Sequence, residues 1–427
     1  MGSLLKEKMA QMIPALRDDI RSLVKKHGAT VISEVTVQQA YGGMRGVKGM
    51  VCDTSVVDPE TGLSIRERPI FELADRLPEE IFFLLVTGEL PGKEELADLQ
   101  KDLVARSAVP QEVWDVLRAM PKHSHPMTML STALMVMEAD SVFRKRYTEG
   151  MSKTEYWEPA LEDSLNMIAK IPVAAAGIYR ICFGKGDPII PKKAADWGGR
   201  YGEALGLPDP TGEFGNLIRL YLTLHSDHEG GNVSANTCHT VGSALSNPFY
   251  AVSAGLNGLA GPLHGLANQE CLKFVLGIQE KYGGVPTDEQ LTEYAWNNLN
   301  SGKVIPGYGH AVLRATDPRF TAFNAFGNRV CPDDEVFKIV DKMFNLVPGI
   351  LKEHGKAKNP WPNVDAGSGA LLYHFGLREF SYYTVLFGVS RCLGMLSQLI
   401  INRALGTAIT RPKSVSTAWM KKAVAKK

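Results

Sequence analysis

The sequence predicts a mainly α-helical fold built from a large domain and a smaller, mobile domain. After Pro69, apolar residues recur at the helical period almost throughout, with Pro and Gly as breaks between segments. Convincing strand patterns occur only before that point. The 427 residues are about three times the size of an ordinary domain, so one core is not expected to hold the whole chain.

The chain opens with a helical pattern. Apolar residues recur every three or four positions over residues 5–24, and Gly28 is placed to end the helix. Pro14 lies inside this pattern, so we expect an interruption of the helix near it. Residues 29–37 alternate apolar and polar positions and predict a short strand, and residues 50–57 predict a second one.

Composition then changes along the helical part of the chain. Residues 237–265 are rich in Ala, Gly and Ser and predict a central or subunit-contacting pair of closely packed helices. The segment that follows is more charged, and a long apolar run begins at Leu371. We therefore predict a large domain formed by residues 1–264 and 371–427 and a small domain formed by residues 265–370, with hinges near Gly265 and Ala370. A hinged junction of this kind would allow closure over a substrate.

Charge and composition exclude several classes of protein. The 47 Lys and Arg against 46 Asp and Glu leave a net charge of +1, which argues against nucleic acid as the main partner. No stretch approaches the roughly 18 uninterrupted apolar residues of a membrane helix, so we expect no membrane span. The six cysteines show no CxxC spacing and fit a reduced compartment.

The two ends of the sequence carry weak targeting information. The first residues show no secretory pattern, and Asp18 and Asp19 lie too early for an acid-poor transit peptide. The last residues, Ala425-Lys426-Lys427, are not a peroxisomal address of the SKL type.

Four stretches combine ionisable side chains with the Gly and Pro that close backbone approach requires. They are residues 226–232, 261–265, 306–310 and 359–365. A histidine flanked by glycines has little cover of its own and sits where backbone N–H groups can face a ligand. His264 and His310 are therefore the strongest catalytic candidates.

Each candidate also has a structural interpretation. A glycine-flanked histidine can serve only a turn or hinge, and Asp365 can cap the helix that follows it. His225 and His228 are spaced as metal ligands can be, but no HExxH pattern or third ligand accompanies them, so we predict no metal site. Residues 307–309 (Gly-Tyr-Gly) lack a following Gly-Lys-Ser/Thr signal and a preceding strand, which argues against nucleoside triphosphate binding.

In their order and spacing, these stretches resemble citrate synthases of the eukaryotic, mitochondrial type. The most specific runs are residues 226–235 (SDHEGGNVSA), 257–270 (NGLAGPLHGLANQE), 306–314 (PGYGHAVLR) with 317–319 (DPR), and 356–366 (KAKNPWPNVDA). The resemblance extends from Tyr41 to Ser414. It implies a helical homodimer of the mitochondrial matrix that condenses acetyl-CoA with oxaloacetate and hydrolyses the resulting thioester, with no cofactor besides these substrates.

The resemblance implies a catalytic trio of His264, His310 and Asp365. Because a thioester methyl group is a very weak acid, a carboxylate base succeeds only if the enolate oxygen is stabilised as it forms. Asp365 would take the proton while a neutral His264 donates a hydrogen bond to that oxygen. His310 would polarise the oxaloacetate carbonyl and protonate the new alkoxide.

The same resemblance assigns residues to the two substrates. Arg319 and Arg391, with His228 and His310, would hold oxaloacetate, because guanidinium groups match carboxylates in bidentate geometry. Arg411 would complete the site of the partner subunit. Each of these arginines would otherwise be an ordinary surface or ion-pair residue. Acetyl-CoA would be bound by Arg45, Val304, Pro306, Gly307, Tyr308, Gly309, Arg314, Lys358 and Asn363.

Several positions depart from the usual pattern of that family. Gly367 stands where His is typical, residues 371–376 (LLYHFG) replace a Gln-Tyr-Tyr run, and Asn236 replaces a His. Residues 62–68 (GLSIRER) replace a more basic stretch, and Lys153 replaces a CoA-binding Arg. Gly367 and the aromatic changes after it lie close in sequence to Asp365 and resemble the related 2-methylcitrate synthases, which accept propionyl-CoA. Either substrate preference, or neutral change in helix packing, fits these departures.

Two further hypotheses remain from other classes. A protein of this fold could bind CoA or dicarboxylates without catalysis, although such a protein would need the arginines but not the base. A metal-dependent lyase would lose activity on chelation, which we do not expect.

Overall fold

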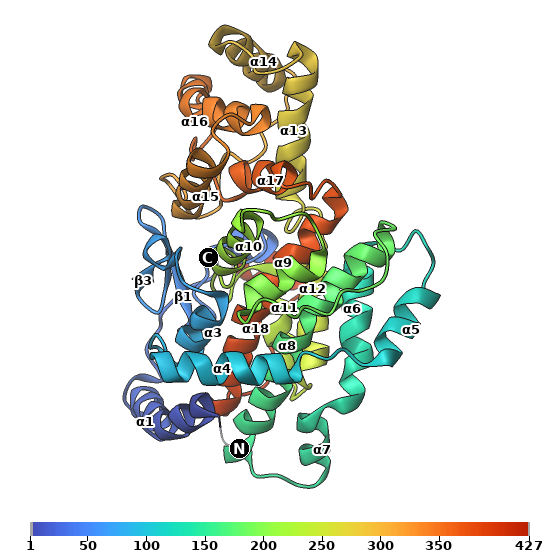
Figure 1. Cartoon of the computed structure of the whole chain (residues 1–427). Helices are drawn as coiled ribbons and strands as arrows, with labels where there is room; N and C mark the ends of the chain where they lie inside the picture. Colours follow the sequence, from blue (N-terminus) through green and yellow to red (C-terminus); the bar gives the residue numbers. More distant parts are fainter. Residues whose placement is uncertain (1–2, 426–427) are drawn as a thin grey trace.

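The chain folds into a mainly helical structure with one small sheet, as the sequence predicts (Figure 1). The computed structural model describes residues 3–425, and within them it has nineteen α-helices and a three-stranded antiparallel sheet. Lys426 and Lys427, which were considered above as part of a targeting signal, lie outside the described residues.

The helices follow one another with short connections. The first twelve are α1 (Leu4–His27), α2 (Val37–Tyr41), α3 (Pro78–Thr87), α4 (Lys93–Arg106), α5 (Gln111–Ala119), α6 (Pro126–Met137), α7 (Val142–Thr148), α8 (Trp157–Cys182), α9 (Trp197–Leu205), α10 (Glu213–Leu224), α11 (Val233–Ser243) and α12 (Pro248–Leu259). The others are α13 (Ala267–Tyr282), α14 (Asp288–Asn300), α15 (Pro318–Val330), α16 (Glu335–His354), α17 (Asp365–His374), α18 (Tyr383–Leu405) and α19 (Thr417–Val424). The strands are β1 (Ser55–Asp58), β2 (Gly62–Ile65) and β3 (Arg68–Pro69).

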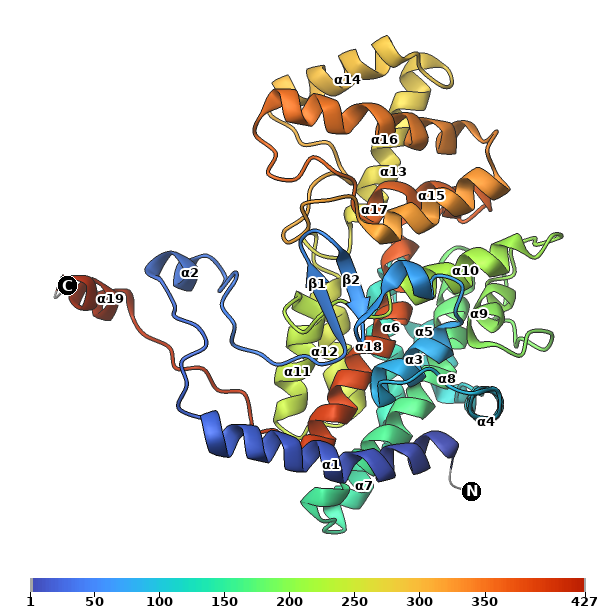
Figure 2. The same ribbon diagram turned by 90° about the vertical axis from the view of Figure 1, so that its left-hand side faces the viewer.

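Two long apolar helices form the centre of the core. Helix α18 packs against α8, α11, α3, α12 and α10, and it crosses the middle of the molecule in both views (Figures 1 and 2). Segments Lys153–Cys182 and Phe380–Leu405 are long and apolar enough to cross a membrane, a property the sequence prediction did not anticipate. Their most apolar windows are 72% and 94% buried inside the protein, so packing in the core accounts for their composition.

Small residues bring α11 and α12 together, which confirms the predicted pair of closely packed helices. A Cβ on Gly255 would lie 2.8 Å from the carbonyl oxygen of Ser234, and one on Gly258 would lie 3.1 Å from the side chain of Val233. The backbones therefore approach to a distance that larger residues would prevent.

Helices α13 to α17 pack mainly on one another and form the upper part of the molecule in Figure 1. Helix α13 contacts α16 and α17, α14 contacts α16, and α15 contacts α17. Their main contacts with the rest of the chain are with α10 and the segment between β3 and α3.

The strand predicted at residues 29–37 is wrong. Residues 29–36 form no regular element, and Thr36 instead caps α2 through a reciprocal capping box with Gln39. Val31 and Ile32 are 76% and 72% exposed, so no partner strand or core covers this stretch. The second prediction, residues 50–57, is confirmed only at its end, where β1 pairs with β2 from Ser55 to Asp58.

The predicted interruption of the first helix is also wrong, because α1 continues through Pro14. A proline there removes the hydrogen bond to the carbonyl of Ala10. Both residues are exposed, so that carbonyl is open to solvent.

Two terminal segments extend away from the main body on the same side. Figure 2 shows α2 and α19 close together at the left. The hydroxyl of Tyr41 donates a hydrogen bond of 2.9 Å to Oγ1 of Thr417, which links the two segments.

Candidate active site

The four stretches singled out in the sequence lie at the ends of α10, α12, α15 and α17. Residues 226–232 join α10 to α11, residues 261–265 follow α12, residues 306–310 precede α15, and residues 359–365 lead into α17. The rings of His228 and His310 lie 5.7 Å apart between centroids. The charge of Arg391 on α18 lowers the pKa of both His228 and His264. The fold therefore gathers residues that are far apart in the chain.

His264 is held in one tautomer by the start of α11. Its Nε2 accepts the backbone N–H of Ser234 at 3.3 Å and lies 3.0 Å from the Ser234 hydroxyl. Because a backbone N–H can only donate, Nε2 carries no proton, and the proton of a neutral ring is on Nδ1. Burial, followed by the charge of Arg391, lowers the pKa of His264 to about 4. The ring is therefore neutral at pH 7 and offers one N–H donor.

His310 is fixed in the opposite tautomer. Its Nδ1 accepts the backbone N–H groups of Val312 at 3.1 Å and Leu313 at 3.0 Å. The proton of the neutral ring is therefore on Nε2. Burial and the nearby guanidinium of Arg319 lower the pKa of His310 to about 4.

Hydrogen bonds join the loop that carries His310 to the loop that carries Asp365. The N–H of Gly309 donates to the carbonyl of Trp361 at 3.1 Å, and the N–H of Asn363 donates to the carbonyl of Gly307 at 2.9 Å. The side chain of Asn363 donates to the Gly309 carbonyl at 2.9 Å and accepts the N–H of Asp365 at 3.0 Å. These bonds fix the positions of the two loops relative to each other.

A glycine is required within this joined pair. Gly307 has φ +80°, and a Cβ there would lie 2.8 Å from both Cα of Ala366 and Sγ of Cys271. Cys271 of α13 thus packs between the two loops, a position that no pattern in the sequence indicated.

Asp365 is the first residue of α17, and Val364 occupies the cap position. The capping interpretation of Asp365 is therefore wrong. Its carboxylate accepts no hydrogen bond from the residues that the structure describes. Burial raises the pKa of Asp365 to about 6, against the attraction of Arg319 and with a further increase from Asp317. An uncommitted carboxylate with a raised pKa is suited to taking a proton near neutral pH.

Two buried arginines supply positive charge beside these groups. Arg391 is 2% exposed, donates from Nε to the carbonyl of His225 at 3.1 Å, and lies 4.8 Å from the ring of Phe387. Burial lowers the pKa of Arg391 to about 10, so it stays charged at pH 7. Arg319 is 4% exposed and pairs through Nε and Nη2 with the carboxylate of Asp317 at 3.0 and 2.7 Å.

His228 lies between these charges. Burial lowers its pKa well below the usual value, and the charges of Arg319 and Arg391 lower it further. The ring is neutral at pH 7 and can donate to an anion from one nitrogen only.

The metal interpretation of His225 finds no support in the structure. Nδ1 of His225 lies 3.0 Å from the Tyr221 carbonyl, and its ring stacks on Tyr221 at 4.1 Å. Among residues 3–425, no group of three or more His, Cys, Asp or Glu side chains is arranged to hold a metal ion.

The remaining predicted residues lie at the edge of the site or away from it. Val304 is 78% exposed and Lys358 is exposed on the two joined loops. Arg314 is turned back on its own loop, where Nη1 donates to the carbonyls of Val312 and Leu313 at 2.9 and 2.7 Å. Arg45 follows α2, and Arg411 lies between α18 and α19; both residues are exposed, on segments that extend from the main body (Figure 2).

The structure gives Gly367 a different neighbourhood from the one its sequence position suggested. A Cβ there would lie 3.2 Å from Cε2 of Phe320 and 3.7 Å from the side chain of Val340. Gly367 is buried and faces the packing between α15, α16 and α17. Its small size is therefore explained by helix packing.

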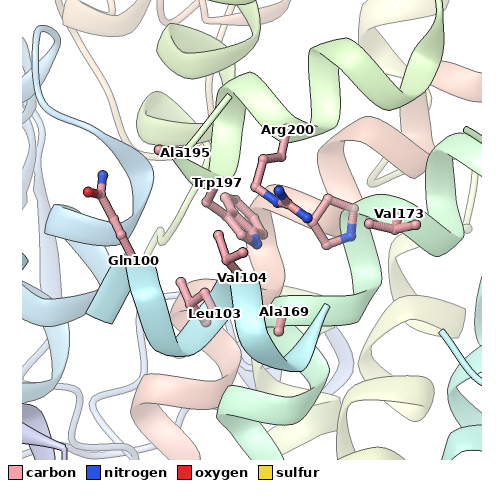
Figure 3. A pocket seen from close by; sticks show the side chains of 9 residues that line it. Gln100, Leu103, Val104, Ala169, Val173, Ala195, Trp197 and Arg200 are labelled. Atoms are coloured by element: carbon pink, nitrogen blue, oxygen red, sulfur yellow. The ribbon is translucent and has the colours of Figure 1, made fainter. Parts of the chain in front are cut away.

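A small pocket lies elsewhere, between α4, α8 and α9 (Figure 3). Its walls are mostly apolar, with Trp197, Leu103 and Val173 among them, and Arg200 at one side. Its volume of about 10 Å³ is near the lower limit for one water molecule. None of the predicted site residues lines it.

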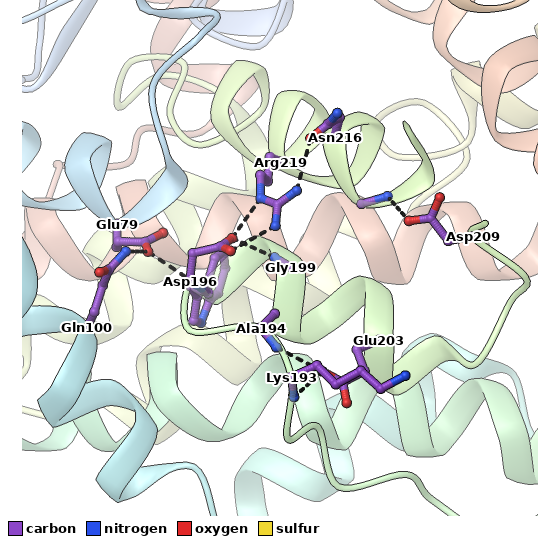
Figure 4. A network of polar contacts seen from close by, with 12 residues as sticks. Glu79, Gln100, Lys193, Ala194, Asp196, Gly199, Glu203, Asp209, Asn216 and Arg219 are labelled. Atoms are coloured by element: carbon purple, nitrogen blue, oxygen red, sulfur yellow. Dashed lines mark hydrogen bonds and ion pairs between the residues drawn. The ribbon is translucent and has the colours of Figure 1, made fainter. Parts of the chain in front are cut away.

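Beside this pocket a polar network connects α3, α4, α9 and α10 (Figure 4). Oε1 of Glu79 accepts hydrogen bonds from Gln100 at 2.8 Å and from the N–H of Trp197 at 3.2 Å. Asp196 pairs with Arg219 through two bonds of 2.9 and 2.8 Å. The network holds α9 against the core and serves a structural purpose.

Comparisons with known proteins agree with this geometry. Residues 43–413 match the family described as "Citrate synthase, C-terminal domain". The chain is 50% identical over 432 residues to the mitochondrial citrate synthase of Saccharomyces cerevisiae, which covers 99% of this chain and 90% of that protein. Citrate synthase 4, mitochondrial, of Arabidopsis thaliana is 49% identical (97% and 90% covered), and the peroxisomal citrate synthase of S. cerevisiae is also 49% identical (98% and 93%).

A solved structure has the same fold at low identity. The citrate synthase of Thermoplasma acidophilum, described as a ternary complex with carboxymethyl coenzyme A and oxaloacetate, superposes with a TM-score of 0.75 at 22% identity. The match covers 90% of this chain and 96% of that one.

Proposed function

The chain belongs to the citrate synthase family and is a condensing acyltransferase, and we propose that its central site joins acetyl-CoA to oxaloacetate and hydrolyses the product to citrate and CoA. One observation carries this proposal beyond family membership. Two neutral histidines, each with a single N–H donor, accompany a half-buried carboxylate that has no hydrogen-bond partner among the described residues. This set provides one base and two donors for oxyanions.

The first step is removal of a proton from the methyl group of acetyl-CoA. Asp365 takes this proton, and the negative charge moves to the thioester oxygen as an enolate. His264 donates from Nδ1–H to that oxygen, so charge develops against a donor already in place. Because Nε2 of His264 is occupied by the start of α11, the ring does not need to change tautomer.

The second step forms the carbon–carbon bond. The enolate carbon attacks the ketone carbon of oxaloacetate, and the carbonyl oxygen becomes an alkoxide. His310 hydrogen-bonds that oxygen through Nε2–H and supplies its proton, and the proton that Asp365 took from the methyl group passes through solvent to restore the N–H of the ring. Water then cleaves the thioester bond and releases CoA. No metal ion or further cofactor is needed for these steps.

Oxaloacetate is bound as a dianion by Arg319, Arg391 and His228. The two guanidinium groups are buried, where their attraction for carboxylates is stronger than in water. Arg391 uses only Nε for its bond to His225, which leaves its terminal nitrogens for a carboxylate. Asp317 occupies the Nε–Nη2 edge of Arg319, which leaves Nη1 and the second N–H of Nη2 for a substrate carboxylate.

Acetyl-CoA is bound along the joined loops. Val304, Pro306, Gly307, Tyr308 and Gly309 present backbone and apolar surface to the adenine and pantetheine. The positively charged side chains of Arg45, Arg314 and Lys358 contact the phosphates, and Asn363 lies beside the pantetheine. The exposure of Val304 and Lys358 is consistent with this role.

The protein acts as a homodimer in which Arg411 completes the site of the partner subunit. Arg411 lies on an exposed stretch that extends from the main body, which is consistent with a contact to a second chain. Residues 265–370 form the small domain that closes over the substrates, and residues 1–264 with 371–427 form the large domain. The mutual packing of α13 to α17 supports this division, although the boundary at residue 370 falls inside α17 (Asp365–His374). The identity to mitochondrial relatives indicates a mitochondrial location.

The 2-methylcitrate alternative is not favoured. Its main support was Gly367, but the nearest neighbours of a Cβ at this position would be the side chains of Phe320 and Val340 and not the base. The rate of CoA release with oxaloacetate, compared for acetyl-CoA and propionyl-CoA, tests this choice. We expect a kcat/KM at least about tenfold higher for acetyl-CoA, the discrimination that one methylene allows.

Gly367→Ala serves as the matched variant in that assay. It should lower the thermal midpoint, because Phe320 must give way, and leave the ratio of the two kcat/KM values within about twofold. Equal or better use of propionyl-CoA by the parent protein would favour methylcitrate formation. Release with neither substrate would favour a non-catalytic binding protein.

A further inference from the structure

The β1–β2 hairpin contacts the loop that carries His228 through side chains that are not part of the active site described above. Thr54 and Ser55, at the start of β1, are 1% and 3% exposed, and Asp227 is fully buried. Oδ2 of Asp227 accepts hydrogen bonds from both hydroxyl groups, at 2.5 Å from Thr54 and 2.8 Å from Ser55.

The Ser55 hydroxyl holds this loop on both sides of His228. It donates to Asp227, the residue before His228, and accepts the backbone N–H of Glu229, the residue after it, at 2.8 Å. One hydroxyl therefore fixes both peptide neighbours of His228. No other side chain of β1 bonds to residues on both sides of that histidine.

The backbone at Glu229 needs such support. Glu229 has φ +61°, a left-handed conformation that non-glycine residues rarely adopt. Besides the bond to Ser55, its Oε1 accepts the N–H of Val57 at 2.7 Å. The strand thus holds a strained turn that directs the His228 ring toward His310.

The other end of the same hairpin contacts the second half of the oxaloacetate site. The carbonyl of Pro59 accepts the N–H of Arg314 at 2.6 Å. Gly62 lies so close to Pro318 that a Cβ would come within 2.6 Å of its ring. One hairpin therefore contacts both the His228 loop and the segment between His310 and Arg319.

We infer that the β1–β2 hairpin positions the oxaloacetate side of the site, with the Ser55 hydroxyl as the positioning residue for His228. The inference rests on the proposed function, because it names what that site requires in order to bind oxaloacetate. Ser55 itself does not contact the substrate; it acts through the two residues that flank His228.

Ser55→Ala tests the inference because it removes one hydroxyl and both of its hydrogen bonds. We expect KM for oxaloacetate, and its Kd by calorimetry, to rise by about tenfold, as loss of one well-placed polar contact would produce. KM for acetyl-CoA should stay within about twofold, because none of the residues proposed to bind that substrate lies on the His228 loop. Ser55→Thr, which keeps the hydroxyl, should restore oxaloacetate binding.

Ser131→Ala is the matched control. Ser131 on α6 is also buried, and its hydroxyl bonds to that of Ser253 on α12 at 2.7 Å, away from the site. It should lower thermal stability without changing either KM. If Ser55→Ala does not fold, two variants of Glu229 repeat the test, because only a side chain with an oxygen can accept the N–H of Val57. Glu229→Ala should then weaken oxaloacetate binding more than Glu229→Gln does.

An unchanged Kd for oxaloacetate in folded Ser55→Ala would overturn the inference. So would equal increases in both KM values, which would indicate a general loss of structure. A parent protein that binds oxaloacetate but releases no CoA would contradict the proposed function while leaving this binding comparison valid.

Discussion

Backbone N–H groups determine the protonation of the two central histidines. Nε2 of His264 accepts from Ser234, and Nδ1 of His310 accepts from Val312 and Leu313. Since each ring nitrogen that faces the backbone is an acceptor, the other nitrogen of each neutral ring is the donor. Burial lowers the pKa of both rings to about 4, so neither changes charge near neutral pH.

The pH dependence of the reaction should therefore report Asp365. Its pKa is raised by burial to about 6, and the reaction needs its deprotonated form. We expect kcat/KM for acetyl-CoA to be constant above about pH 7. Below about pH 6 it should decrease with falling pH, and the decrease should approach about tenfold for each pH unit. A profile that stays flat from about pH 8 down to about pH 5 would contradict this assignment.

The sequence identified these residues for a physical reason. His264 and His310 are flanked by glycines, and a glycine is needed at position 307 because a side chain would clash with Ala366 and Cys271. Ser234 and Ser55 could not be found in the same way. Their hydroxyl groups act across separations of 30 and 174 residues, to His264 and Glu229, and no local pattern marks such partners.

At the scale of elements, the network of α3, α4, α9 and α10 contains a buried acid. Glu79 is 1% exposed, and its Oε2 has no hydrogen-bond partner among the described residues. Burial raises the pKa of Glu79 to about 7, while the bonds from Gln100 and Trp197 oppose the increase. The negative charge of Asp196 nearby adds to it.

Glu79→Gln should remove a pH dependence of stability. The folded state holds the proton up to about pH 7 and the unfolded state releases it near the ordinary glutamate pKa of 4.5, so stability falls as pH rises between these values. Ionised Glu79 would cost about 3 kcal/mol above pH 7. The variant should thus melt higher than the parent at pH 8 and about level with it at pH 5, in thermal unfolding at both pH values.

The opposite order, with the larger gain at pH 5, would contradict a raised pKa at Glu79. Gln100→Leu, which removes a donor to the same carboxylate, provides the control. It should steepen the loss of stability with rising pH.

The elements were predicted with uneven success, and the errors in strand prediction share one cause. The helices of the core, such as α18, can be predicted from the apolar pattern of their own residues, without reference to distant parts of the chain. Residues 29–36 alternate as a strand does, yet a strand needs a partner and this segment has none within the described chain. Conversely, β2 follows β1 directly and pairs with it, although residues 62–65 alone give little strand signal.

At the scale of the whole molecule, each site is proposed to be completed by the partner's C-terminal segment. The domain division is predicted from composition and the dimer from the family resemblance. The packing of α13 to α17 supports the first, and the exposed terminal segments support the second. Such long-range organisation depends on surfaces that a single sequence does not reveal.

Mixed dimers test the position of Arg411. Arg411→Ala and Asp365→Asn should each be inactive alone. If Arg411 acts on the partner's site, a mixed dimer has one site with both changes and one site with neither. Random mixing makes half of the dimers mixed, and half of the sites in those dimers are intact. About a quarter of parent activity should therefore return. If Arg411 acted within its own chain, every mixed site would carry one change, and no activity would return.

The most direct test of the central claim is Asp365→Asn, measured for citrate formation and for oxaloacetate binding on the same preparation. The amide keeps the size of the side chain but cannot act as a base. We predict that kcat falls by at least about a thousandfold while Kd for oxaloacetate changes by less than about threefold. Turnover close to that of the parent would contradict the assignment of Asp365 as the base of the reaction.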